Sequence, residues 1–327
     1  MIRLIFLYPI SVVVRIIILI RNKLYDWNIL RATHSKLPVI SIGNIQVGGT
    51  GKTPFVASLI KLLYQNKIKP VIITRGYKRI TNQQIILNDS NQYSVEETGD
   101  EPYYLKKIFA EVSIIIDHNK NRAVHTANTM QNIDCIILDD GYQSRYIKRD
   151  IDIVLINTWV NPLHFFVMPS GYLREKISNL NRADFIYTTK GEKSKKLFTQ
   201  YNTHHLNISY QLSTYNNEKY KLVDSITKKD SQKIIAFSGI ANPNHFKESL
   251  SKINIEYDQI INLKNHYQYS LETHPIIDDE NIIYITTYKD FFKLSLRKSM
   301  VYILDIQINI DDNLLLKKII QKIHEAK

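Results

Sequence analysis

A glycine-rich stretch near the N-terminus, SIGNIQVGGTGKTP at residues 41–54, constrains the fold more than any other feature of this sequence. Ahead of it, the apolar run at 37–42 reads as a short buried strand. Behind it, residues 52–66 repeat apolar side chains at helical spacing. The glycines therefore lie on a turn from a strand into a helix. Such turns are typical of phosphate-binding loops, where backbone N–H groups and a positive helix end face phosphate oxygens.

Each residue type in this loop suits contact with the phosphates of a nucleotide. Gly48, Gly49 and Gly51 have no side chains, so their backbone N–H groups can approach the oxygens closely. Lys52 can reach the β- and γ-phosphates, and the hydroxyl of Thr53 can ligate Mg²⁺. The predicted nucleotide-binding residues are Gln46, Val47, Gly48, Gly49, Thr50, Gly51, Lys52 and Thr53. The alternative is a glycine-rich turn that a lysine and a threonine follow by chance.

One position departs from the common phosphate-loop pattern. In G-x-x-x-x-G-K-[ST] the first glycine would stand where this chain has Gln46. This departure leaves open which class of nucleotide-binding protein carries the loop.

Two carboxylates end the strand-like run IDCIILDDGYQ at residues 133–143. In a phosphate-loop fold, an aspartate at the end of such a strand faces the loop and holds Mg²⁺ directly or through water. Asp139 and Asp140 are therefore predicted metal ligands together with Thr53, and an ordinary strand-ending turn is the alternative. Cys135, inside the apolar run, is interpreted as core packing.

A second acidic pair lies in ETGDEPYYLKK at residues 97–107, just ahead of a helical pattern. Acidic side chains at this place favour a helix N-terminus, which is one explanation of Asp100 and Glu101. The functional alternative is a base that takes a proton from an attacking hydroxyl group.

Five further apolar runs alternate with helical patterns, which predicts an α/β fold with a phosphate-loop NTPase-like, doubly wound parallel sheet. These runs are 70–74, 112–116, 134–140, 151–157 and 184–189. A polar, alternating segment at 204–224 follows and is typical of paired strands. A second β/α series then predicts a smaller α/β domain. Its strands are expected near 233–239, 258–263, 282–287 and 301–306, before a closing amphipathic helix at about 311–324.

The N-terminal segment MIRLIFLYPISVVVRIIILIRNKLYDW predicts an amphipathic helix at the membrane interface. On a helix, Ser11, Arg15, Asn22 and Asp26 fall within about 60° of one another and form a narrow polar stripe. The apolar part is shorter than the roughly 20 residues that a spanning helix needs, and it contains a proline and an arginine. The basic residues expected near acidic lipid are Arg3, Arg15, Arg21 and Lys23. A buried core helix and a membrane-spanning helix are the alternatives.

The charge balance of the chain indicates an anionic partner. The 327 residues include 43 Lys and Arg against 31 Asp and Glu, a net charge of +12. Much of the lysine accompanies an excess of Ile, Asn and Tyr, which share A/T-rich codons, and no helicase-like motif or basic stripe is present. Nucleic acid is therefore not a predicted partner. A single cysteine cannot form an internal disulfide, which suits a reducing cytoplasm.

Six motifs occur in one order over nearly the whole chain. They are SIGNIQVGGTGKTP at 41–54, ITRGY at 73–77, GDEP at 99–102, ILDDGYQ at 137–143, PSGYLRE at 169–175 and TTYKD at 286–290. In these motifs the chain resembles the tetraacyldisaccharide 4'-kinases, the lipid A 4'-kinases. Members of that family transfer the γ-phosphate of ATP to the distal glucosamine of a membrane-embedded lipid A precursor. The loop of the family begins at Gly43 and Asn44, so Gln46 lies within its pattern.

The resemblance implies roles for the phosphate and metal residues. It places Lys52 on the phosphates of ATP, and Thr53 with Asp139 or Asp140 on Mg²⁺. Arg174 resembles a family arginine near the phosphates, where a cation can stabilise the charge of transfer. An ordinary ion pair with the neighbouring glutamate is the alternative for Arg174.

The resemblance also implies Asp100 as the catalytic base, assisted by His266 of the second domain. Asn265 departs from the family, which usually has aspartate before this histidine, so the orientation of the imidazole would rest on a hydrogen bond without charge. Ser144 and Lys78 are two further departures, and neither removes a phosphate or metal contact.

Two motifs stay without a definite role. Arg75 and Tyr77, at the end of their strand, lie where ligands of α/β proteins bind, and they serve the sugar, its 1-phosphate or the fold itself. The motif TTYKD is interpreted as structural or close to adenine.

Together with these patterns, the resemblance implies a kinase with ATP and Mg²⁺ as cofactors. It also implies a lipid A precursor and the membrane surface as partners, on the cytoplasmic face of the bacterial inner membrane. The expected parts are a membrane-associating helix at 1–30, a phosphate-loop kinase domain at 31–203, a paired-strand linker at 204–224 and a C-terminal α/β domain at 225–327. The alternative function is a membrane-associated ATPase of the positioning type, although those proteins have a lysine where this chain has Val47.

Overall fold

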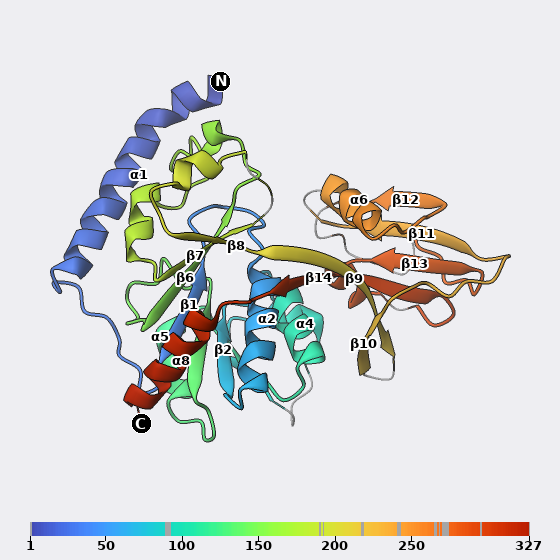
Figure 1. The fold of residues 1–327 in the computed structure, drawn as a ribbon, viewed down its shortest axis with the longest axis horizontal. Coiled ribbons are helices and arrows are strands. Elements are labelled where there is room, and N and C mark those ends of the chain that lie inside the picture. Colours follow the sequence, from blue (N-terminus) through green and yellow to red (C-terminus); the bar gives the residue numbers. More distant parts are fainter. Residues whose placement is uncertain are drawn as a thin grey trace.

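The computed structural model describes residues 2–88, 93–189, 191, 193–216, 219–240, 243–264, 267, 269, 275–294 and 296–326. Within them the chain forms two sheets side by side, with a long helix along the outer side of the first (Figure 1). We call the part around the first sheet the first domain and the part around the other sheet the second domain. The predicted α/β fold class with a parallel-sheet core and an N-terminal helix is confirmed.

The first sheet has eight strands among the described residues, in the order β3-β4-β2-β5-β1-β6-β7-β8. In chain order they are β1 (Val39–Gly43), β2 (Pro70–Thr74), β3 (Ile85–Leu87), β4 (Ser113–Ile116), β5 (Cys135–Asp139), β6 (Ile151–Asn157), β7 (Phe185–Thr189) and β8 (Thr203–His205). All neighbours pair in parallel except β3 and β4, which pair antiparallel. The short edge strand β3 has no counterpart in the sequence prediction, because three apolar residues are too few to give a period.

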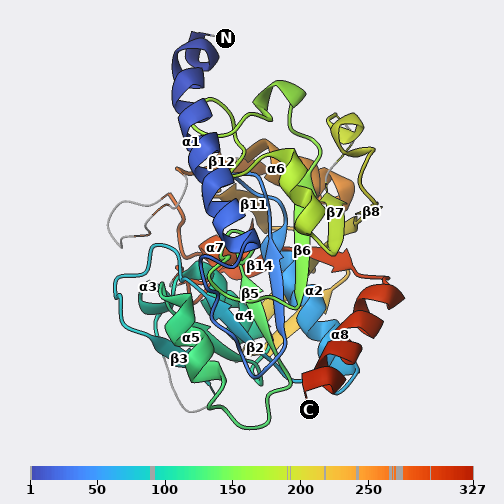
Figure 2. The ribbon, with the colours of Figure 1, turned by 90° about the vertical axis from the view of Figure 1, so that its left-hand side faces the viewer.

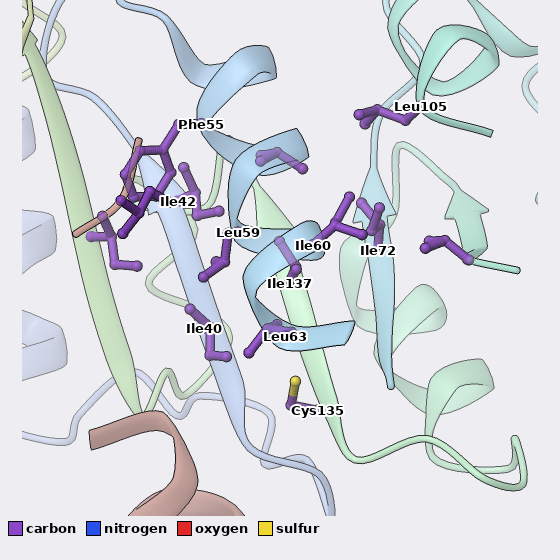
Figure 3. Packing of buried hydrophobic residues seen from close by; sticks show 14 of the residues in the cluster. Ile40, Ile42, Phe55, Leu59, Ile60, Leu63, Ile72, Leu105, Cys135 and Ile137 are labelled. Carbon is purple, nitrogen blue, oxygen red and sulfur yellow. The ribbon is translucent and has the colours of Figure 1, made fainter. Parts of the chain in front are cut away.

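Helices cover both faces of the first sheet, which explains the unbroken apolar strands. They are α2 (Lys52–Gln65), α3 (Val95–Thr98), α4 (Asp100–Ile108) and α5 (Lys120–Ala127), with 3₁₀ turns η1 (Pro162–His164), η2 (Ile177–Arg182) and η3 (Lys195–Phe198). Figure 3 shows Phe55, Leu59 and Leu63 of α2 packed over Ile40 and Ile42 of β1. These side chains have no exposed surface, so the helix that follows the glycine loop is held firmly on the sheet.

Cys135 lies in this core, as predicted (Figure 3). Burial raises the pKa of its thiol to about 12, so the thiolate that reacts with oxidants or metals is scarce at neutral pH.

The second sheet has six strands among the described residues, in the order β10-β9-β14-β13-β11-β12. They are β9 (Asn207–Asn216), β10 (Lys219–Val223), β11 (Lys233–Ser238), β12 (Gln259–Asn262), β13 (Ile282–Thr286) and β14 (Met300–Asn309). The helices of this part are α6 (Pro243–Lys252) and the single turn α7 (Tyr288–Phe291). The alternating segment after β8 forms the antiparallel pair β9–β10, and β9 also pairs antiparallel with β14.

The chain returns to the first domain at its end. Helix α8 (Asn313–Ala326) lies beside α2 in Figures 1 and 2, and its residues Leu315, Ile319 and Ile323 join the core around α2. The sequence pattern placed this helix with residues 225–327, because it follows the last strand of the second series directly. The packing instead closes the first core with a segment from the opposite end of the chain.

Helix α1 (Ile2–Asp26) runs along the first domain (Figure 2), and two side chains of its polar stripe contact the rest of the protein. Ser11 is buried and accepts a hydrogen bond from the backbone N–H of Ser170 at 2.9 Å. Asn22 is also buried and donates to Glu175 Oε2 at 3.2 Å. The outward side of the helix is apolar, with Phe6, Ile10, Val13, Ile16, Ile17 and Ile20 exposed. Among the helices of the described residues, none has the length and apolar character that crossing a bilayer requires.

We expect Ile319→Ala in α8 to lower the free energy of unfolding by about 2–4 kcal/mol, because it removes buried methyl groups and leaves a cavity in the first core. Urea unfolding followed by circular dichroism measures this change. Leu314→Ala, on the exposed side of the same helix, is the control and should stay within about 0.5 kcal/mol of the parent. Equal effects of the two substitutions would contradict the packing of α8 on the first domain.

Candidate active site

The glycine loop between β1 and α2 has a backbone that leaves space for a ligand. Gly48 and Gly51 have φ angles of 111° and 85°, a region that side chains disfavour, and Gly51 caps α2. A Cβ atom at Gly48 or Gly49 would meet no heavy atom within 4 Å. The loop therefore faces open space at the N-terminus of α2, where a phosphate group fits.

Gln46, the departure from the common loop pattern, fastens the loop to the sheet. Its side chain is almost fully buried and exchanges two hydrogen bonds with the backbone of Asn157 at the end of β6, at 2.8 and 3.0 Å. Farther along the loop, Asn44 Nδ2 donates to the hydroxyl of Thr50 at 3.0 Å. Side-chain amides thus connect the loop to the end of β6 and join its two ends.

Asp140 lies at the centre of a charged cluster at the end of β5. Its carboxylate is 3.2 Å from Lys52 Nζ, and Arg174 Nη1 donates to both carboxylate oxygens at 2.8 and 2.9 Å. Burial alone would raise the pKa of this carboxyl, but Lys52 and Arg174 outweigh it and hold the pKa well below its ordinary value. The structure thus brings together three of the predicted site residues.

Asp139 has a different environment from its neighbour. Thr74 donates a hydrogen bond to Asp139 Oδ2 at 2.9 Å. Burial, reinforced by the negative charge of Glu101, raises the pKa of the Asp139 carboxyl. A cation that approached both carboxylates would favour the ionised form of Asp139.

Lys120 is a site residue that sequence reasoning missed. It is fully buried at the start of α5, and its Nζ donates to the backbone carbonyl oxygens of Asp139 and Asp140 at 2.6 and 2.8 Å. Burial lowers the pKa of this ammonium group to about 8. A cation in the first turn of a helix is unfavourable to the helix dipole, and this is the signal that could have found it.

The donor set fits a Mg²⁺ ion that binds both protein and phosphate oxygens. The protein side chains of this set are Thr53, Asp139 and Asp140. Among the described residues, no group of three or more His, Cys, Asp and Glu side chains could by itself hold a metal ion. Mg²⁺ in kinases binds one or two carboxylates and completes its octahedron with phosphate oxygens and water. Two adjacent carboxylates beside an open phosphate loop are the donor set that this arrangement needs.

Asp100 and Glu101 begin α4, and both pair with lysines of the second domain. Lys293 Nζ lies 2.9 Å from Asp100 Oδ2, and Lys289 Nζ lies 3.0 Å from Glu101 Oε1. The predicted partner of Asp100, His266, and the neighbouring Asn265 lie outside the described residues.

A basic cavity of about 240 Å³ adjoins the charged cluster. Its lining comprises Arg21 and Tyr25 of α1 together with Arg75, Asp140, Gln143, Ser144, Arg145, Tyr146 and Arg174. Four guanidinium groups around so small a volume suit an anionic, hydroxyl-rich ligand. Arg75 of the ITRGY motif belongs to this lining, and the side chain of Tyr77 is largely exposed.

The chain matches known proteins over nearly its whole length. A sequence profile of the family described as Tetraacyldisaccharide-1-P 4'-kinase matches residues 3–324. A tetraacyldisaccharide 4'-kinase from Aquifex aeolicus is 32% identical over 320 residues, which cover 97% of this chain and 98% of that protein. A protein of the same name from Flavobacterium johnsoniae is 34% identical and covers 92% and 91% of the two chains.

A solved structure has the same fold. The crystal structure of LpxK from Aquifex aeolicus, described as an "apo" form in complex with ATP, is 29% identical to this chain and superposes with a TM-score of 0.81. The superposition covers 99% of both chains.

We expect Thr53→Ala to lower turnover by about 10³-fold and to raise the Mg²⁺ concentration needed for half-maximal rate at least about tenfold. The reason is that phosphoryl transfer depends on the placement and charge of the metal. Initial rates over a Mg²⁺ titration measure both effects, and Thr129→Ala, an exposed threonine, is the control. An unchanged Mg²⁺ dependence in Thr53→Ala would show that the metal binds elsewhere.

Proposed function

The chain belongs to the tetraacyldisaccharide-1-P 4'-kinase family, and on this premise we propose which lipid hydroxyl it phosphorylates and which of its residues do so. The substrate is a tetraacyldisaccharide 1-phosphate, an intermediate of lipid A biosynthesis, and the γ-phosphoryl group of ATP is transferred to its 4'-hydroxyl. One observation carries the proposal: Asp140 belongs both to the charged cluster at the phosphate loop and to the lining of the basic cavity. A donor and an acceptor bound at these two places would meet at this side chain.

The donor side consists of the loop and its cations. Backbone N–H groups from Gly48 to Thr53 bind the phosphates of ATP, and Lys52 and Arg174 lie where negative charge develops during transfer. Thr53 with Asp139 or Asp140 would hold Mg²⁺, which would supply positive charge to the phosphates of ATP. Lys120 keeps the two aspartates in place through their backbone carbonyls.

The acceptor side needs a base and a place for the sugar. Asp100 accepts the proton of the 4'-hydroxyl, and His266 is the assisting residue. The hydroxyl oxygen bonds to the γ-phosphorus as ADP leaves. The sugar and its 1-phosphate occupy the basic cavity, where Arg75 and Arg145 contribute positive charge. The family match favours this reaction over a positioning ATPase. Val47 also favours it, because positioning ATPases have a lysine at this place.

The membrane surface at the cytoplasmic face of the inner membrane is the proposed location. Ser11 and Asn22 of the polar stripe are buried against the protein, and the opposite side of α1 presents apolar side chains to the outside. Exposed apolar side chains continue beyond the helix at Trp27, Ile29 and Leu30. So many exposed apolar side chains in one segment favour a membrane or partner contact. An acylated substrate in the bilayer would then have its sugar head beside Arg21 and Tyr25 at the end of α1.

We expect labelled phosphate to move from ATP to a lipid A precursor, and ATP turnover to depend on that acceptor. Asp100→Ala should lower kcat by about 10²–10⁴-fold with nearly intact ATP binding, because the base acts on the hydroxyl and not on the nucleotide. Glu96→Ala, at an exposed site just before α4, is the control. The proposed mechanism would be contradicted by ATP hydrolysis that is independent of the lipid. A normal kcat in Asp100→Ala would also contradict it.

We expect Ile16→Gln, Ile17→Gln and Ile20→Gln together to weaken binding to phosphatidylglycerol-containing vesicles at least about tenfold, because each removes apolar area that would be buried in lipid. Cosedimentation with vesicles measures the binding. Leu314→Gln, an equally exposed leucine on α8, should leave it unchanged. If the triple variant sediments like the parent, the outward side of α1 is not the membrane contact.

A further inference from the structure

The motif TTYKD lies in a segment that crosses from the second domain to the candidate active site. We call residues 287–293 the α7 segment, because they consist of α7 and its two ends. The segment directly follows β13 in the second sheet and packs against α4 of the first domain. The phosphate and metal chemistry described above assigns no task to it.

Asp290 anchors the α7 segment in the second domain. Its carboxylate is buried and accepts hydrogen bonds from the backbone N–H of Gly239 at 3.0 Å and from the hydroxyl of Tyr269 at 3.0 Å. The hydroxyl of Thr287 donates to the same carboxylate at 2.8 Å. These bonds tie the segment to the end of β11, so its position follows that of the second sheet.

Aromatic side chains join the α7 segment to α4. The ring of Tyr288 stacks on Tyr104 at 3.8 Å between centroids, and Phe292 meets Tyr103 edge-on at 5.2 Å. Aromatic contacts thus join α4, whose first residue is Asp100, to the second domain.

Two ion pairs complete this contact, and they differ in exposure. The side chains of Lys293 and Asp100 are each 18% exposed, whereas those of Lys289 and Glu101 are 33% and 39% exposed. Ion pairs at exposed sites contribute little, and shielding from water strengthens them. The stronger restraint of the two therefore acts on Asp100.

We propose that Lys293 is a positioning residue for Asp100. Its ammonium group, carried by the second domain, holds the Asp100 carboxylate in the orientation from which it accepts the proton of the attacking hydroxyl. Asp100 occupies the first residue of α4, directly after Gly99. This inference rests on the proposed role of Asp100 as the base. It gives the α7 segment a function: the second domain supplies the alignment of the base.

Lys293→Met tests the inference in the full-length enzyme with ATP and a lipid A precursor. We expect kcat to fall about 10- to 100-fold and both KM values to stay within about twofold, because a misplaced base slows transfer without weakening binding. Lys293→Arg should recover most of the rate. Lys289→Met removes the neighbouring ion pair of the same segment, so it controls for a role in domain contact alone, and its kcat should fall less than about threefold.

A double variant separates positioning from other roles. In Asp100→Ala, adding Lys293→Met should have no further effect on kcat, whereas independent roles would multiply the two losses and overturn the inference. A rise in the KM for ATP with unchanged kcat would also overturn it, because Lys293 would then bind the nucleotide. Thermal melting checks each variant, and Lys293→Gln replaces Lys293→Met if the latter does not fold.

The same experiments distinguish this inference from the proposed function. Normal activity in Asp100→Ala would remove Asp100 from the mechanism altogether. Loss of activity in Asp100→Ala together with normal kcat in Lys293→Met would leave the base in place and refute its positioning by Lys293.

Discussion

Asp140 places a negative charge at the end of a buried strand, and the site is organised around the cations that compensate for it. Lys52 comes from the phosphate loop and Arg174 from the segment after the cis-linked Pro169, so one carboxylate joins parts of the chain that are far apart in sequence. Lys120 holds the same turn from its backbone side. Because an uncompensated charge in such a place is costly, these contacts define where the loop, the strand end and the arginine lie relative to one another.

The second domain contacts the first domain at two places. It reaches the first domain through the α7 segment, which contacts α4 from its start, and through β14, which continues into α8 on the first core. The two connections differ in kind. The packing of α8 is apolar and structural, whereas the contacts of the α7 segment end on groups with a proposed chemical task.

The sequence predicted those features that depend on local pattern. A strand, a glycine turn and a helix with a lysine and a threonine at its start define the loop without knowledge of the rest, because the backbone conformation follows from nearby residues. The carboxylates at the end of β5 and the alternation of strands and helices were predictable for the same reason. The family match supports the same conclusion about the chain as a whole.

The sequence by itself determined the fold class, the phosphate loop and the acidic strand end, because period, glycine placement and residue type specify local structure. The tertiary structure alone decided that the polar stripe of α1 binds Ser170 and Glu175, that α8 completes the first core and that Lys120 reaches the carbonyls of Asp139 and Asp140. It also decided which lysine meets Asp100. Each of these contacts joins residues that are distant in the chain. A local sequence pattern does not specify which distant surfaces pack together and exclude water.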